Sequence, residues 1–219
     1  MKQGEIWWIT GASSGIGEGL AREVAERGAS VILSGRNVAA LERVAAECGD
    51  ALVLPFEATD YAAIPAITEQ AWGWKGRVDA LVNNAGISQR SLAVETDFGV
   101  YERMIAVDLL APIALTQANL PRMVQAGGGR IVAVSSVAGL VGSPMRSAYS
   151  AAKFGLVGYH DSVRAENEHL GVQVHVVAPG SVKTNVSRNA LLKDGSARGV
   201  SDKAIENGKS TAEAAEAIL

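Results

Sequence analysis

The residues best suited to chemistry in this sequence are Tyr149 and Lys153, which lie four positions apart, with Ser136 thirteen positions before the tyrosine. On a helix, positions i and i+4 share one face, so the phenol and the ammonium would lie together. An ammonium beside a phenol favours the phenolate, which suits a general acid or base. A serine hydroxyl delivered from a preceding strand could then polarise a substrate oxygen. The same spacing also arises by chance on exposed helices, so the surrounding elements must show whether this pair is catalytic.

A glycine-rich turn near the start of the chain is suited to binding a phosphate. The apolar run 6–10 ends at Gly11, Gly15 and Gly17 follow, and apolar residues then recur at helical spacing over 18–27. A strand, a turn and a helix in this order bring a phosphate against a helix N-terminus. The spacing G-x-x-x-G-x-G differs from the standard G-x-G-x-x-G fingerprint. A merely tight loop is the alternative, but the strand before and the helix after favour a phosphate site.

The end of the next strand, 29–34, is where dinucleotide-binding folds distinguish NAD from NADP at the ribose 2′ position. An acidic residue there would accept a hydrogen bond from the 2′-hydroxyl of NAD. This chain has Arg36 instead, with Ser13 and Ser14 in the glycine turn. A cation and hydroxyls suit a 2′-phosphate, so we predict NADP in preference to NAD. The alternative is that Arg36 is a solvated surface residue.

Strands and helices alternate along the chain, which predicts a parallel sheet covered by helices on both faces. Pro65 predicts a late start or a kink in the helix before Gly76, and Pro112 and Pro121 predict a kinked or two-piece helix. The expected strands are 6–10, 29–34, 51–56, 78–83, 131–135 and 172–178, and the expected helices are 18–27, 37–48, one ending before 76, 96–125, 149–170 and 211–219.

The polar segment 186–209 shows no sustained apolar period, and we interpret it as a mobile loop over the site; a disordered surface excursion is the alternative. The last helix, 211–219, is expected to be capped by Thr211. The length of 219 residues indicates one domain, 1–219.

The bulk composition argues against several classes of protein. The formal net charge of −3 and the absence of basic runs argue against a nucleic-acid surface. Neither a signal peptide nor a membrane span is evident, and the single Cys48 is compatible with a reducing compartment, so we expect a cytoplasmic protein. His160, His169 and His175 lack partners at metal-ligand spacing, so no metal is expected. We expect His160 and His169 to be ordinary helix-surface residues.

Together these signatures resemble the classical short-chain dehydrogenase/reductase family over nearly the whole chain. Residues 10–17 fit its cofactor turn and 83–86 its fourth-strand motif, while 179–184 resembles the segment beside its nicotinamide. Ser136, Tyr149 and Lys153 fit its catalytic residues. The resemblance implies a Rossmann-type doubly wound parallel sheet flanked by helices in a single α/β domain.

The implied activity is an NADP-dependent oxidoreductase that interconverts a carbonyl and an alcohol, with Tyr149 as general acid/base, Ser136 holding the carbonyl oxygen and Lys153 also holding the nicotinamide ribose. We expect Ser88, Arg90, Ala138, Pro144, Met145 and the loop 186–209 to shape the substrate pocket. The expected cofactor residues are Gly11, Ser13, Ser14, Gly15, Ile16, Gly17, Arg36, Glu57, Ala58, Asn84, Ala85, Gly86, Tyr149, Lys153, Pro179, Gly180, Val182 and Thr184.

Three departures from the family matter. Asp108 stands where the family has an Asn that supports a proton relay, and an ionised carboxylate cannot donate a hydrogen bond; we predict a working but slower relay. Glu57 replaces an Asp near the adenine, although Ala58 could still donate through its backbone.

Family members continue with a helix, a last strand and a C-terminal segment, which are absent after Leu219. Three explanations remain open: a truncated chain, a disordered tail and a naturally short variant. An uncovered edge strand would affect the stability of the fold and the wall of the substrate pocket more than the cofactor site.

The resemblance also implies a small-molecule partner and a homodimer or homotetramer, with no nucleic acid or membrane partner. The family dimerises through the helices here at about 97–126 and 149–170, where Ala152, Phe154, Leu156 and Val157 could form an apolar surface. The competing hypothesis is a non-catalytic dinucleotide sensor or scaffold. Such a protein would be expected to lose the tyrosine or the lysine, and this chain keeps both.

Overall fold

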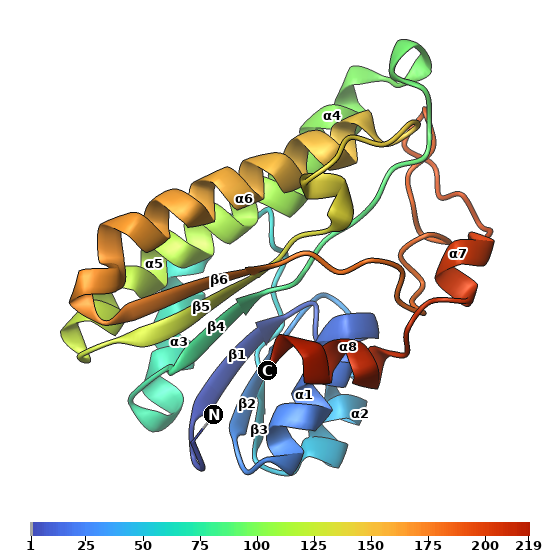
Figure 1. Ribbon diagram of the computed structural model, residues 1–219. Coiled ribbons are helices and arrows are strands. Elements are labelled where there is room, and N and C mark those ends of the chain that lie inside the picture. Colours follow the sequence, from blue (N-terminus) through green and yellow to red (C-terminus); the bar gives the residue numbers. More distant parts are fainter. Residues whose placement is uncertain (1) are drawn as a thin grey trace.

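A parallel sheet forms the centre of the computed structural model, which describes residues 2–219. It has six strands in the order β3-β2-β1-β4-β5-β6, and every neighbouring pair is parallel (Figure 1). The predicted doubly wound α/β fold is therefore confirmed, and the sheet ends at β6. The strands are β1 (Ile6–Thr10), β2 (Ser30–Ser34), β3 (Ala51–Val53), β4 (Ala80–Asn83), β5 (Gly129–Val134) and β6 (Val172–Val177).

Helices cover both faces of this sheet (Figure 1). One face carries α1 (Gly15–Glu26), α2 (Val38–Cys48) and α8 (Thr211–Ile218). The other face carries α3 (Ile64–Lys75), α5 (Ala111–Gln125) and α6 (Ser147–Asn167). The remaining elements are α4 (Phe98–Ile105), α7 (Lys203–Glu206), the 3₁₀ turns η1 (Ala93–Glu95), η3 (Val137–Gly139) and η4 (Glu168–Leu170), and the π-helical turn η2 (Ala106–Leu110).

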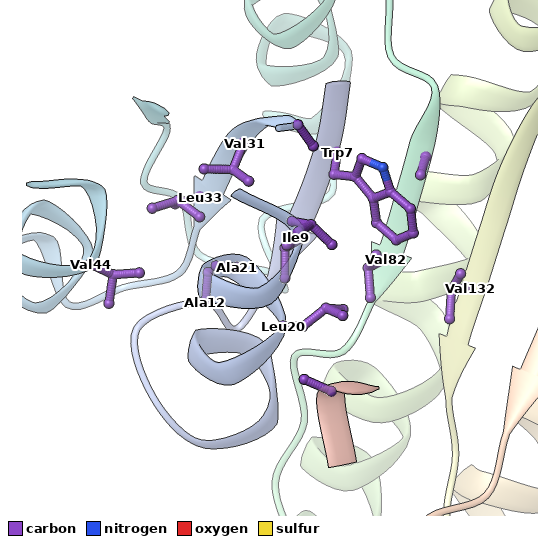
Figure 2. Packing of buried hydrophobic residues seen from close by; sticks show 14 of the residues in the cluster. Trp7, Ile9, Ala12, Leu20, Ala21, Val31, Leu33, Val44, Val82 and Val132 are labelled. Carbon is purple, nitrogen blue, oxygen red and sulfur yellow. The ribbon is translucent and has the colours of Figure 1, made fainter. Parts of the chain in front are cut away.

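The strands are apolar on both sides because each face of the sheet has its own core. In β1, Trp7 and Ile9 point to the face covered by α1 and α2, where they pack in the cluster that Figure 2 shows. Ile6 and Trp8 point to the opposite face and pack with Trp72 of α3. All the residues of β1 and β2 are buried, which explains the continuous apolar runs in the sequence.

The element boundaries differ from the predictions in ways that have local causes. The third strand is shorter than expected, because it pairs with β2 only over Ala51–Val53. Pro65 lies in the first turn of α3, where a missing N–H costs nothing, so the late-start prediction is confirmed. The long helix is indeed divided, but the π-helical turn η2 divides it before Pro112, and Pro121 lies inside α5.

The segment 186–209 is not irregular throughout, contrary to the prediction. It contains α7, and Leu191 forms isolated bridges with Gln89 and Ala197. The following helix α8 is capped by Ser210 rather than by Thr211: the Ser210 hydroxyl accepts from the Glu213 N–H at 3.1 Å, and the Glu213 carboxylate accepts from the Ser210 N–H at 2.6 Å. Mobility of the segment stays a prediction.

No helix among residues 2–219 combines the length and the apolar character that crossing a membrane requires. In the same residues, no group of three or more His, Cys, Asp or Glu side chains is placed to hold a metal ion.

Candidate active site

A cleft of about 780 Å³ opens at the carboxyl ends of the strands, where an open α/β sheet binds its ligand. The loops after β1, β2, β3, β4, β5 and β6 all contribute to its wall. Every predicted catalytic and cofactor residue lines this cleft except Gly17. They are Gly11, Ser13, Ser14, Gly15, Ile16, Arg36, Glu57, Ala58, Asn84, Ala85, Gly86, Asp108, Ser136, Tyr149, Lys153, Pro179, Gly180, Val182 and Thr184.

The glycine turn after β1 leaves the first N–H groups of α1 available to an anion. Gly11 has a φ of +67°, and a Cβ there would lie 2.9 Å from the Ala85 Cα atom, so the turn requires glycine. Ser14 is the N-cap of α1, yet its side chain makes no capping hydrogen bond. Free N–H groups at a helix N-terminus are a phosphate site, and these residues therefore fit a dinucleotide pyrophosphate.

Gly17 has a packing role and does not line the cleft. A Cβ on Gly17 would lie 2.4 Å from the Gly11 carbonyl oxygen and 2.5 Å from Asn84 Nδ2. The third glycine lets α1 pack directly under the turn. Its expected contact with the cofactor stays a prediction.

Thr10, which was not among the predicted site residues, fastens the glycine turn to the loop after β4. Its hydroxyl donates to the Val82 carbonyl at 3.0 Å and accepts from the N–H groups of Asn84 and Ala85 at 3.0 and 3.1 Å. The Asn84 side chain donates to the Thr10 carbonyl at 2.9 Å. A threonine at the end of an apolar strand was the available signal, since a buried hydroxyl needs partners.

Arg36 and Glu57 lie at the ends of β2 and β3, on opposite sides of one corner of the cleft. Arg36 Nη1 lies 3.5 Å from Glu57 Oε2, and the two side chains are 66% and 46% exposed. An ion pair this long and this exposed is weak, so the guanidinium can turn to another anion. The Ser13 hydroxyl lies beside Gly35 in the same corner.

Tyr149 and Lys153 lie on α6, one turn apart, as the spacing predicts. Tyr149 is buried, and the Lys153 Nζ atom lies 5.8 Å from the centroid of its ring. Ser136, at the end of β5, is the N-cap of η3, where its hydroxyl accepts from the Ala138 N–H at 3.2 Å. The three side chains of the predicted catalytic set therefore face one cleft from two adjacent elements.

Lys153 is held at the floor of the cleft by two acceptors. Its ammonium donates to the Val134 carbonyl at 3.1 Å and lies 3.2 Å from Asp108 Oδ2, while Asp108 Oδ1 accepts from the Ile87 N–H at 2.8 Å. Burial alone would lower the pKa of Lys153, but Asp108 and Tyr149 outweigh burial and raise that pKa, so the lysine stays cationic. Burial raises the pKa of Asp108, against the opposing effects of Lys153 and the Ile87 N–H.

Comparison with known proteins assigns the family. A family model described as short chain dehydrogenase matches residues 5–194. The chain is a short-chain dehydrogenase/reductase. It is 39% identical over 219 residues to mouse dehydrogenase/reductase SDR family member 7B, covering 96% of this chain and 68% of that protein. It is 40% identical over 195 residues to human dehydrogenase/reductase SDR family member 7, covering 85% of this chain and 58% of the human protein.

A solved structure of a short-chain dehydrogenase from Streptomyces avermitilis superposes with a TM-score of 0.89 at 31% identity, over 99% of this chain and 83% of that one. As a short-chain dehydrogenase/reductase, this protein is an oxidoreductase of a family that binds an NAD(P) dinucleotide and acts on small molecules.

The substrate end of this short-chain dehydrogenase/reductase differs in detail from the sequence-based expectation. Ser88 lines the cleft, as predicted, and 186–209 contributes Leu191 and Ile205. Arg90, Ala138, Pro144 and Met145 are absent from the lining, and Arg146 takes their place. Arg146 was not among the predicted pocket residues, although its position three residues before Tyr149 was a usable signal.

His160 is fully buried, so its expected place on the helix surface is wrong; His169 is exposed, as expected. The His160 Nδ1 atom donates to the Leu156 carbonyl at 2.9 Å, and Nε2 lies 3.5 Å from the side chains of Asn83 and Thr116. Burial lowers the pKa of His160. His160 lies seven positions after Lys153 and four after Leu156, so it shares their buried face of α6.

The expected apolar surface of α6 is also partly wrong. Ala152 and Leu156 are buried within the chain, because they belong to the face that packs on the sheet and on α4. Phe154 is 45% exposed and remains available to another molecule.

Proposed function

We propose that this short-chain dehydrogenase/reductase uses NADP to interconvert a carbonyl compound and its alcohol, with Tyr149 as general acid and base. The observation that carries the proposal is the convergence of Ser136, Tyr149 and Lys153 on the cleft into which the N-terminus of α1 also opens. A proton donor, a cation and a phosphate site in one cleft serve hydride-transfer chemistry.

Each side chain has a part in carbonyl reduction. The Ser136 hydroxyl holds the carbonyl oxygen, and Tyr149 gives its hydroxyl proton to that oxygen. The cationic Lys153 stabilises the phenolate that remains. When bound, the reduced nicotinamide supplies the hydride that the carbonyl carbon receives, and this chemistry is not available from amino-acid side chains. The reverse transfers oxidise the alcohol.

Preference for NADP is supported by Arg36. Its guanidinium is mostly exposed and holds Glu57 only at 3.5 Å, so a 2′-phosphate offers it a better partner. The hydroxyl of Ser13 lies beside the same corner. Glu57 opposes this preference through its negative charge, so the arginine must outweigh it.

Fluorescence titration with NADPH and NADH tests the cofactor assignment. We expect tighter binding of NADPH by the wild-type chain and loss of that preference in Arg36→Asp. Arg27→Asp, a change of equal charge outside the cleft, should leave the preference unchanged. If neither nucleotide binds, the assignment fails. Binding without turnover of any carbonyl compound would favour the non-catalytic sensor or scaffold.

We also propose a homodimer through the helices α4, α5 and α6. Support comes from apolar side chains exposed on α4, on α6 and on the turn η2, namely Phe98 at 76%, Phe154 at 45% and Leu110 at 43%. Light scattering on the wild type and on Phe154→Glu tests this: the wild type should be a dimer and the variant a monomer. A monomeric wild type would contradict it.

A further inference from the structure

Arg146 is the charged residue of the substrate end that stands closest to the proposed acid. It directly precedes α6, three residues before Tyr149, and it lines the cleft. The centre of its guanidinium lies 5.7 Å from the centroid of the Tyr149 ring, and its side chain is 22% exposed. A group bound to this guanidinium would therefore lie in the same part of the cleft as the Tyr149 side chain.

The positive charge of Arg146 is not neutralised by a bonded carboxylate. Among residues 2–219, Asp202 is the single carboxylate within 4.0 Å of its guanidinium, and the contact of 3.9 Å is too long for a hydrogen bond. Asp202 already accepts hydrogen bonds from Arg90 on Oδ2 and from Arg198 on Oδ1. Three guanidinium groups surround one carboxylate, which leaves an excess of positive charge beside the cleft.

The other charged groups of the cleft are accounted for. Lys153 is paired with Asp108 on the floor, and Arg36 with Glu57 at the corner assigned to the adenosine. Arg103 also lines the cleft, from α4, but among residues 2–219 Arg146 is the arginine that lies against the Tyr149 ring. Arg146 is therefore the cation best placed to act on a substrate.

The backbone before Arg146 is held in an unusual conformation. Met145 has a φ of +61°, and among residues 2–219 it is the only residue other than glycine with a positive φ. The Ser91 N–H donates to the Met145 carbonyl at 3.2 Å, and Ser91 forms a bridge with Arg146. A left-handed conformation at a methionine is unfavourable, and such strain is commonly kept where it positions a functional side chain.

We propose that Arg146 is an anion-binding residue of the substrate pocket and that the substrates are carbonyl compounds bearing a carboxylate or a phosphate. This inference rests on the proposed carbonyl chemistry. The planar guanidinium can form two parallel hydrogen bonds with either anion, which orients the substrate as well as binding it. The carbonyl would then be presented to Tyr149 a few bonds away from the anionic group.

Matched pairs of ketones test the subsite. Levulinate has a carboxylate where methyl levulinate has a neutral ester. Hydroxyacetone phosphate has a phosphate where hydroxyacetone has a hydroxyl group. We expect wild-type kcat/KM with NADPH to favour the anionic member in at least one pair. Arg146→Gln should lower kcat/KM for that member roughly 10- to 100-fold, as expected for a charge-assisted hydrogen bond, and leave its neutral partner within a few-fold. Arg146→Lys should fall between the two.

A second cation tests whether charge alone explains the effect. Arg188 is an exposed arginine of the segment 186–209 that does not line the cleft, so Arg188→Gln removes the same charge from the same region. The preference for the anionic ketone should be unchanged in Arg188→Gln. An equal loss in both variants, or an unchanged preference in Arg146→Gln, would overturn the proposal.

Binding of unreactive anions separates this inference from the proposed activity. Calorimetric titration of the NADPH complex with valerate, valeramide and propyl phosphate needs no turnover. We expect one or both anions to bind the wild type and not Arg146→Gln, with valeramide binding neither. If no ketone is reduced but this pattern holds, the activity proposal fails and the anion subsite stands. If valerate and propyl phosphate bind both proteins equally, or neither protein, the subsite is refuted.

Discussion

The ammonium of Lys153 lies 3.2 Å from the Asp108 carboxylate, and the two side chains are 5% and 0% exposed. Lys153 reaches Asp108 from α6, and Asp108 lies in the π-helical turn η2 between α4 and α5. The lysine that faces Tyr149 therefore carries a buried counter-charge, where the family pattern has an uncharged asparagine. This pair decides how much of the lysine's charge acts on Tyr149.

The first prediction concerns this counter-charge. In Asp108→Asn the side-chain oxygen can still accept from the Ile87 N–H, and Lys153 is released from its ion pair. Because Asp108 helps to raise the pKa of Lys153, the variant should lower that pKa. We expect kcat to stay the same or rise. Steady-state kinetics over pH checks this, and a large fall in kcat would show that the carboxylate itself is required.

Asp108→Ala provides the matched structural comparison. It leaves the Lys153 ammonium buried without its partner and the Ile87 N–H without its acceptor. Breaking a buried pair in this way costs about 3–5 kcal/mol. Urea denaturation should show that loss in the free energy of unfolding for alanine and a smaller one for asparagine.

The second prediction separates catalysis from binding at Tyr149. Tyr149→Phe keeps the buried ring beside Arg146 and Lys153 and removes only the hydroxyl. Loss of a general acid should lower kcat by about 100- to 10,000-fold. Nucleotide binding, followed by fluorescence titration, should weaken by no more than a few-fold, because the other expected cofactor residues are kept. Retained turnover would show that another group delivers the proton.

The third prediction concerns Asp202, which fastens the segment 198–202 to the loop after β4. Partial burial would raise its pKa, but hydrogen bonds from Arg198 and Arg90 outweigh burial and lower the pKa to about 2, from an ordinary value of 3.8. A carboxyl with a lowered folded-state pKa stabilises the fold above the ordinary value, and this stability is lost as pH falls towards the lowered one.

Urea denaturation near pH 5 and near pH 3 should therefore show acid destabilisation that is smaller in Asp202→Asn than in the wild type. Hydrogen exchange at pH 7 should be faster in the segment 186–209 of this variant. An equal acid sensitivity of both proteins would contradict the assignment.

The fourth prediction concerns the buried His160, whose ordinary pKa of 6.5 is lowered by burial. Below that value the unfolded chain binds a proton that the folded chain resists, so the free energy of unfolding should fall as pH decreases. Denaturation at about pH 7.5 and pH 5.5 should show a smaller loss for His160→Gln than for the wild type. His169→Gln, at an exposed site, should match the wild type.

The sequence determined the parts of this protein that depend on local geometry. Apolar runs between helical patterns predicted the parallel sheet, because a strand covered on both faces must be apolar throughout. The spacing of Tyr149 and Lys153 placed both on one face of α6, since helical geometry is the same wherever a helix forms. The glycine turn before α1 predicted a phosphate site from residues that are adjacent along the chain.

The tertiary structure alone decided which distant groups meet. His160 lies on the face of α6 that the sheet covers, and the sequence could not show how far that cover extends. Asp202 joins Arg90 across 112 positions of sequence, and Arg146 lines the cleft directly after Met145, which takes a left-handed conformation and accepts a hydrogen bond from Ser91. Periodicity and turn chemistry are encoded by neighbours along the chain. Ion pairs and pocket walls are made by segments that become neighbours only when the strands have paired in the order of the folded sheet. Their partners are therefore set by the topology of the fold.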